Sequence, residues 1–131
     1  AVEKGDVEAN LYLAQAYEAL GNSTEQEKCI DAYIKEYPKS SVAYNKQGLN
    51  AMESGDYENA ISEFSAGLEA DEVTNEQELR SNLIAAYEYN LDFDKAKELM
   101  QAYLADYPED EAAAREYLFL NKNRNEENST E

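Results

Sequence analysis

The sequence predicts an all-α protein, an α-solenoid of three helix–turn–helix repeats that ends in a C-terminal capping helix. Three observations support this fold class. Ala16-Tyr17-Glu18 recurs as Ala86-Tyr87-Glu88, an offset of 70 residues, which is twice the roughly 34-residue period of a helical repeat plus a short insertion. Apolar residues recur at helical spacing. Five Gly and two Pro are too few to punctuate a β-sheet protein of 131 residues.

This offset divides the chain into three repeats of equal length, with shorter segments at both ends. Asn75 and Glu76 form the insertion, which precedes the third repeat. The predicted segments are a lead-in or stub of a preceding repeat at 1–6, repeat 1 at 7–40, repeat 2 at 41–74, repeat 3 at 77–110, a capping helix at 109–122 and a polar tail at 123–131.

Repeat 1 contains two stretches whose apolar residues follow the spacing of an amphipathic helix. Gly21 ends the first helix, because glycine readily adopts the left-handed conformation of a helix C-terminus, and Pro38 stops the second. The apolar residues of the two helices are Leu13, Tyr17 and Leu20, then Ile30, Tyr33, Ile34 and Tyr37.

Repeat 2 has the same organisation. Gly55 ends its first helix, and Asp56 caps the second, since an aspartate side chain accepts hydrogen bonds from the free N–H groups of a first helical turn. The apolar stripe of the second helix consists of Tyr57, Ala60, Ile61, Phe64 and Leu68.

Repeat 3 carries similar signals at its helix ends. Thr74 and Gln77 have the spacing of a capping box at the start of its first helix. Asp92 caps the second helix, and Pro108 stops it. The apolar stripes are Leu79, Leu83 and Tyr87, then Phe93, Ala96, Met100, Tyr103 and Leu104.

The capping helix at 109–122 covers the apolar face that the last repeat of a solenoid leaves open. We predict that it packs through Ala113, Ala114, Tyr117 and Leu118. The residues that follow are polar and are predicted to form a tail.

The charge balance restricts the classes of partner. Acidic residues outnumber basic ones, 29 to 11, which gives a net charge of −18. Nucleic acid is excluded as a partner, because its binding needs Lys and Arg to neutralise phosphates, and direct contact with an anionic membrane is disfavoured for the same reason. Proteins or peptides with cationic or apolar groups remain, although solubility alone is the other explanation of the charge.

The residue types that catalysis and metal binding need are scarce. The sequence has no His, and Cys29 is its only cysteine, so an internal disulfide and a thiolate zinc site are excluded. The sequence contains no nucleophile–base pair and no phosphate-binding loop. We therefore predict that the chain is not an enzyme and that it takes no cofactor.

Targeting signals are not evident in the chain. No apolar run approaches the roughly 20 residues that cross a bilayer, and the given chain has no basic-then-apolar leader, so a signal peptide, if one existed, has been removed. The chain begins with Ala1 rather than Met, which indicates an excised or processed soluble fragment. Its compartment does not follow from these features.

The pattern of large and small residues resembles the tetratricopeptide repeat over residues 7–122. In that family, small residues lie where the two helices of a repeat cross closely, and large residues fill the space around them. The matching residues are Leu13, Ala14, Tyr17, Gly21, Ile30 and Pro38 in repeat 1, Tyr44, Gly48, Gly55, Tyr57, Ala60 and Phe64 in repeat 2, and Leu83, Tyr87, Phe93, Ala96, Met100 and Pro108 in repeat 3.

The resemblance implies a superhelix whose concave groove is lined by the first helix of each repeat. The side chains that it places there form an apolar strip flanked by acidic residues, and Gln15 and Asn45 are candidates to hydrogen-bond a peptide backbone. Such a set suits a segment with apolar anchors and basic residues between them. The predicted groove residues are Glu8, Leu11, Gln15, Glu18, Asn45, Leu49, Met52, Glu53, Glu78, Ser81, Ala85, Glu88, Tyr89, Arg115 and Phe119.

Charge excludes one binding mode of the family. Repeats of this family that clamp an acidic chain terminus carry Lys, Arg and Asn at five groove positions. Glu78 stands at one of them and would repel a carboxylate. The residues at the five positions are Leu11, Gln15, Lys46, Glu78 and Asn82.

The sequence therefore predicts a protein–protein interaction scaffold that binds a peptide or partner helix in its concave groove. The alternative is a structural spacer or self-association module of a larger protein, in which apolar groups such as Phe119 and Leu120 form dimer contacts. The fold alone does not decide between them.

Overall fold

The computed structural model describes residues 23–129, with side chains described within 24–121. This part of the chain folds into six α-helices joined by short connections. The predicted all-α class, with helices packed in consecutive pairs, is confirmed. The predicted first helix of repeat 1 and its predicted end at Gly21 lie outside the described residues. The six helices are α2 (Ser23–Glu36), α3 (Ser41–Glu53), α4 (Tyr57–Leu68), α5 (Glu76–Tyr89), α6 (Phe93–Asp106) and α7 (Glu111–Ser129).

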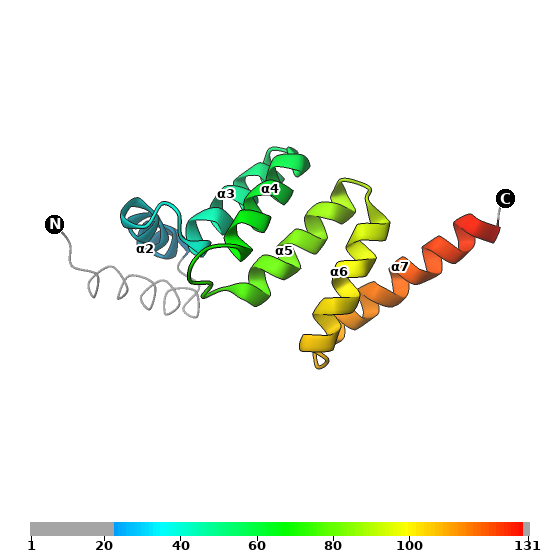
Figure 1. The fold of residues 1–131 in the computed structure, drawn as a ribbon. Coiled ribbons are helices and arrows are strands. Elements are labelled where there is room, and N and C mark those ends of the chain that lie inside the picture. Colours follow the sequence, from blue (N-terminus) through cyan, green and yellow to red (C-terminus); the bar gives the residue numbers. More distant parts are fainter. Residues whose placement is uncertain (1–22, 130–131) are drawn as a thin grey trace.

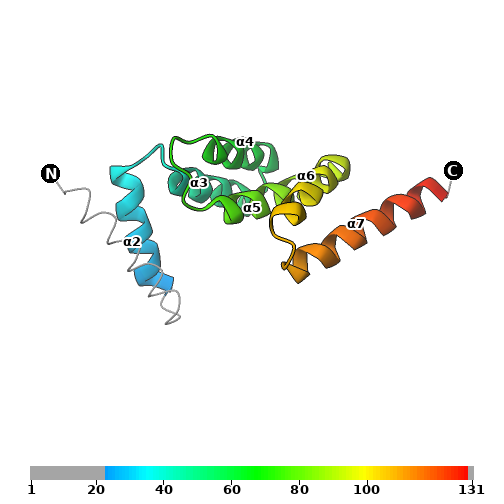
Figure 2. The same ribbon diagram turned by 60° about the horizontal axis from the view of Figure 1, so that its bottom comes forward.

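The helices follow one another along the molecule, with α2 at one end and α7 at the other (Figures 1 and 2). From α3 onward, each helix packs against the next one in the chain, and α3 also reaches α5. The contact between α2 and α3 is much sparser than those between the later helices. This order of contacts is that of a linear helical array, in which each hairpin covers its neighbour.

The α3–α4 and α5–α6 turns have the same backbone conformation. Gly55 and Leu91 occupy equivalent positions, and both have positive φ angles, 79° and 64°. In each turn the next residue, Asp56 or Asp92, donates its N–H to a carbonyl of the preceding helix at 2.9 Å. This Schellman arrangement satisfies carbonyl groups that a helix end leaves free. Glycine adopts this conformation readily, whereas leucine is strained in it.

The same two aspartates cap the helices that follow them, as predicted. The Asp56 carboxylate accepts from the N–H of Asn59, and the Asp92 carboxylate accepts from the N–H of Lys95, each at 3.2 Å. At each turn, the backbone N–H of one aspartate therefore caps the C-terminus of the preceding helix, and its side chain caps the N-terminus of the next helix.

The predicted capping box at the start of α5 is wrong. Asn75 stands at the N-cap without a side-chain cap bond. The Gln77 amide donates instead to the Tyr103 hydroxyl at 3.0 Å, and the Thr74 N–H donates to the Ser41 hydroxyl at 3.3 Å. Contacts with α3 and α6 therefore outweigh the local capping pattern at this helix start.

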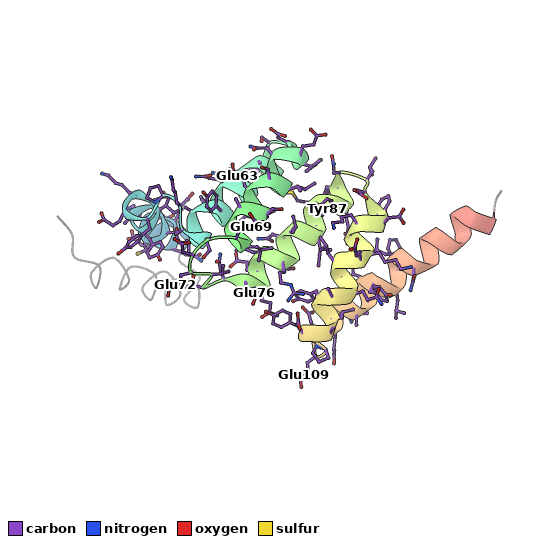
Figure 3. All side chains as sticks on the ribbon, in the orientation of Figure 1. Glu63, Glu69, Glu72, Glu76, Tyr87 and Glu109 are labelled. Atoms are coloured by element: carbon purple, nitrogen blue, oxygen red, sulfur yellow. The ribbon has the colours of Figure 1, made fainter. Side chains whose placement is uncertain are left out.

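Two hydrophobic clusters form the core of the described residues. The first joins α3, α4 and α5, and the second joins α5, α6 and α7. Tyr87 (labelled in Figure 3) and Leu99 pack against both clusters. The buried members are Ala51, Ala60, Phe64, Leu79, Leu83 and Ala86 in the first, and Ile84, Ala96, Met100, Tyr103 and Leu120 in the second.

Close helix crossings in the first cluster depend on two glycines. A Cβ atom on Gly48 would lie 2.3 Å from Cε1 of Phe64, and a Cβ atom on Gly67 would lie 2.9 Å from Cδ2 of Leu79. Phe64 and Leu79 are both fully buried, so neither side chain has free space to move into. The α3–α4 and α4–α5 pairs approach this closely because glycine carries no side chain.

A polar cluster joins α5 to the connection between α6 and α7. The Arg80 guanidinium donates to Asp106 at 2.7 Å and lies 5.7 Å from the centroid of the Tyr103 ring. The Tyr103 hydroxyl donates to Asp110 at 2.6 Å, and Asp110 also caps α7 by accepting from the N–H of Ala113. Burial and this hydrogen bond raise the pKa of Tyr103, and the same bond lowers the pKa of Asp110. The cluster fixes the position at which α7 begins.

Helix α7 is longer than predicted. It begins at Glu111 and continues to Ser129, beyond the predicted end at residue 122 and into the predicted polar tail. Residues 123–129 contain neither Gly nor Pro, so no helix-breaking residue ends the helix earlier. Within residues 23–129, no helix has both the length and the apolar character needed to span a membrane.

The packing face of α7 is rotated from the predicted one. Ala113 and Tyr117 pack against the second cluster, as predicted, but the third contact is Leu120, which is only 6% exposed. Leu118, which was predicted on this face, is 66% exposed. Residues 113, 117 and 120 lie on one side of a helix, and residue 118 does not. Leu120 is consequently not available as the dimer contact that the sequence suggested.

Candidate functional site

The predicted groove residues fall on three described helices and on a segment outside them. Glu8, Leu11, Gln15 and Glu18 lie outside the described residues. We call the groove residues on α3 and α5 the α3–α5 face. The described groove residues are Asn45, Leu49, Met52 and Glu53 on α3, Glu78, Ser81, Ala85, Glu88 and Tyr89 on α5, and Arg115 and Phe119 on α7.

Two hydrogen bonds join α3 and α5 on this face. The Asn45 amide nitrogen donates to Oε1 of Glu78 at 3.0 Å, and the Asn82 amide nitrogen donates to Oδ1 of Asn45 at 2.8 Å. Asn45 is 7% exposed, so its amide lies beneath the surface rather than open to solvent. Asn82 is one of the five positions compared with the clamp of the family, but it was not included in the predicted set of peptide-binding residues. Its position four residues after Glu78, on the same side of α5, is the signal that identifies it.

Large apolar side chains on the α3–α5 face remain exposed. Leu49 is 41% exposed and Tyr89 is 62% exposed. The Tyr89 ring stacks on Tyr57 of α4, with ring centroids 5.4 Å apart and planes 22° apart, which holds it in place while leaving most of its surface open. Met52 is half-buried and packs against the first hydrophobic cluster. The face therefore presents one aliphatic and one aromatic group on a fixed scaffold.

Acidic side chains accompany these apolar groups. Glu53 and Glu78 are exposed, as is Ser81, and Glu88 is half-buried. Burial is the main cause that raises the pKa of Glu88 to about 7, and the charge of Glu116 and a hydrogen bond with it raise the pKa further. Glu88 is thus only partly ionised near neutral pH, whereas an ordinary glutamate is fully ionised there.

The two groove residues on α7 lie on a helix that extends away from the rest of the array (Figure 1). Phe119 is 56% exposed, and Arg115 is also exposed. Glu116 of α7 lies close enough to Glu88 of α5 for its charge and a side-chain hydrogen bond to raise the pKa of Glu88. No local pattern in the sequence identifies that carboxyl pair, because the two residues belong to different helices.

Comparison with protein families identifies the repeats. Residues 8–40 and residues 82–110 each match the model of the tetratricopeptide repeat. A search of curated proteins gives no match. The match identifies these two segments as tetratricopeptide repeats, and the consecutive helix pairs α3–α4 and α5–α6 have the arrangement of such repeats.

Proposed function

We propose that the α3–α5 face binds a peptide or a partner helix that carries apolar anchors between basic side chains. Tetratricopeptide repeats are generally protein–protein interaction modules, and the family is non-catalytic, so the proposal includes no chemical step. The observation that carries the proposal is the exposure of Leu49 and Tyr89 beside acidic residues.

The chemistry of the partner follows from the surroundings of these two side chains. Exposed apolar groups with a polar rim are typical of binding sites, and the rim here consists of carboxyl groups such as Glu53 and Glu78. A net charge of −18 attracts a cationic partner and repels an anionic one. An amphipathic basic segment satisfies both features of the face.

The test is a titration with labelled peptides in which Leu or Phe alternates with Lys or Arg. We expect the substitution Leu49→Glu to weaken binding at least about tenfold, because it places a charge at an apolar contact. Leu118→Glu is the matched control, since it makes the same change at an exposed leucine of α7 away from this face. Peptides that bind the wild-type protein and the Leu49→Glu variant equally well would refute the proposal.

A second candidate function is self-association through α7. Leu118 and Phe119 are consecutive residues of α7, and both carry exposed apolar side chains of the kind that dimers bury. Light scattering over a range of concentrations tests this candidate. A dimer that dissociates when Phe119→Glu is introduced would support it, whereas a monomer at every concentration would exclude it.

A further inference from the structure

The side chains of Asn45, Glu78 and Asn82 form a hydrogen-bonded series whose donors and acceptors have one consistent assignment. A carboxylate only accepts, so the amide nitrogen of Asn45 must face Glu78. The Asn45 oxygen then points to Asn82, which must present its own amide nitrogen to it. The charge on Glu78 therefore fixes the orientation of both amides.

This assignment decides what the series offers to a ligand. The remaining oxygen of Glu78 and the carbonyl oxygen of Asn82 are acceptors with no partner among these three side chains. Glu78 is exposed and Asn82 is half-buried, so both lie at or near the surface of the α3–α5 face. Asn45 is buried beneath them and holds them in position. Such a site is organised in advance to receive hydrogen-bond donors, and it has a negative charge to favour cationic ones.

The basic residues that lie nearest in sequence to Asn45 and to Glu78 do not neutralise the charge of Glu78. Lys46, next to Asn45 on α3, pairs with Glu27 of α2 at 3.1 Å. Arg80, which follows Glu78 on α5, pairs with Asp106 of α6 at 2.7 Å and lies over two tyrosine rings. Both cations are therefore held by other helices.

We propose that Glu78 and Asn82 form a subsite for one cationic side chain, lysine or arginine, of the bound peptide. This inference rests on the proposed function and adds the position of the charge to it. Leu49 lies one helical turn beyond Asn45 on α3, so an apolar side chain of the same peptide contacts Leu49 while the cation occupies the subsite. The two peptide residues are then neighbours or nearly so in the peptide sequence, because one helical turn spans about 5.4 Å and an extended residue about 3.3 Å.

An anionic side chain does not fit this subsite. A carboxylate would meet the negative charge of Glu78 and the amide oxygen of Asn82, and the one donor left to it would be the second N–H of the Asn82 amide. A neutral amide has donors but gains no charge-assisted bond. The subsite thus distinguishes ligands by charge and by hydrogen-bonding capacity together.

The experiment uses a short fluorescein-labelled peptide of leucine, serine and glycine with a single central arginine. Two further versions carry lysine or citrulline at that position, and citrulline is the neutral analogue of arginine. Fluorescence anisotropy at about 0.15 M salt limits long-range charge effects. We expect the wild-type protein to bind the arginine peptide about tenfold more tightly than the citrulline peptide. The lysine peptide shows whether an ammonium group is accepted as well as a guanidinium group.

Variants of the protein localise the effect. Glu78→Gln keeps an oxygen for Asn45 and removes the charge, so the affinity ratio between the arginine and citrulline peptides should fall to about one. Glu76→Gln is the matched control, because it removes the same charge from an exposed residue in the first turn of α5 (Figure 3). It should leave the ratio near its wild-type value. Asn82→Ala removes one acceptor but keeps the charge, and it should lower the ratio partway.

The outcomes separate this inference from the proposed function. A ratio that stays high in the Glu78→Gln protein, or that falls equally in the Glu76→Gln protein, overturns the subsite. If the citrulline peptide binds the wild-type protein but not the Leu49→Glu variant in that case, the face still binds peptides and only the position of the charge is wrong. If no peptide binds the wild-type protein, the proposed function fails and the subsite fails with it.

Discussion

Adding one methyl group at the crossing of α3 and α4 tests the packing of the array most directly. The substitution Gly48→Ala places a Cβ atom 2.3 Å from Cε1, 2.5 Å from Cδ1 and 2.8 Å from Cζ of Phe64. Carbon atoms in ordinary contact are about 3.5 Å apart, so the ring or the helices must move by about 1.2 Å. Phe64 is 0% exposed, and its neighbours leave no space for the movement.

The expected magnitude combines two opposing effects. Overpacking of this kind costs about 1–3 kcal/mol, and the short distance here places the cost near the upper end. Replacing glycine by alanine within a helix contributes about 1 kcal/mol in the other direction. We therefore expect Gly48→Ala to lower the free energy of unfolding by about 2 kcal/mol, and the melting temperature by about 5–10 °C.

Urea and thermal unfolding, followed by far-ultraviolet circular dichroism, measure the effect. Phe64→Leu removes ring atoms, so the loss caused by Gly48→Ala should be smaller in that background by about 1 kcal/mol. Gly55→Ala is the control for backbone strain, since its Cβ meets nothing within 4 Å but its φ angle is 79°. It should cost about 1 kcal/mol in either background. A stabilised Gly48→Ala protein, or losses at 48 and 64 that simply add, would refute the close crossing.

Three further predictions concern single side chains. Leu91→Gly should stabilise the protein by about 0.5–1 kcal/mol in urea unfolding, because Leu91 has a φ angle of 64° and is 74% exposed, so strain is relieved and little burial is lost; a destabilised variant would contradict this. The pKa of Glu88 is raised from 4.5 to about 7, so the folded state binds the Glu88 proton more tightly than the unfolded state does. The stability that this proton contributes is lost as the pH rises from about 5 to 8. Glu88→Gln should therefore gain stability over the wild type between about pH 5 and pH 8, whereas a constant difference would show that Glu88 titrates normally. Tyr103→Phe removes the bond to Asp110 and should cost about 1 kcal/mol, with faster amide exchange in the first turn of α7; unchanged exchange there would show that the hydroxyl does not hold that helix.

Local signals in the sequence account for most of the fold. The helix ends at Gly55 and the caps at Asp56 and Asp92 were predictable, because each depends on residues within one turn of the chain. The left-handed conformation of Leu91 was not predictable from its side chain, which disfavours it. Only comparison with Gly55 at the equivalent repeat position indicates it.

Contacts between helices were the part that sequence reasoning missed. Gln77 had a local partner in the expected capping box, but a tertiary partner, the Tyr103 hydroxyl, takes its amide. On α7, the apolar spacing fits a stripe that includes Leu118 as well as one that includes Leu120, and the helical period alone does not choose between them. Packing against the second hydrophobic cluster selects Leu120.

In the candidate site, too, the positions along each helix were predictable from the sequence and the contacts between helices were not. The repeat pattern placed Leu49 and Tyr89 on the first helices of their repeats, and both side chains are exposed. The pattern gave no indication that Asn45 is buried and hydrogen-bonded to Glu78 and Asn82. These partners are 33 and 37 residues from Asn45 in the sequence, and such bonds depend on how α3 and α5 are aligned in three dimensions.

The side chains shared by the two hydrophobic clusters have a consequence for cooperativity. Tyr87 and Leu99 belong to both clusters, so a change at either position weakens two interfaces at once. In a linear array, such coupling between neighbours makes successive hairpins melt together rather than one by one. We therefore expect helices α3 to α7 to unfold as a single cooperative block; among the described helices, α2 has only a sparse contact with its neighbour α3 and is not joined to this block by either cluster.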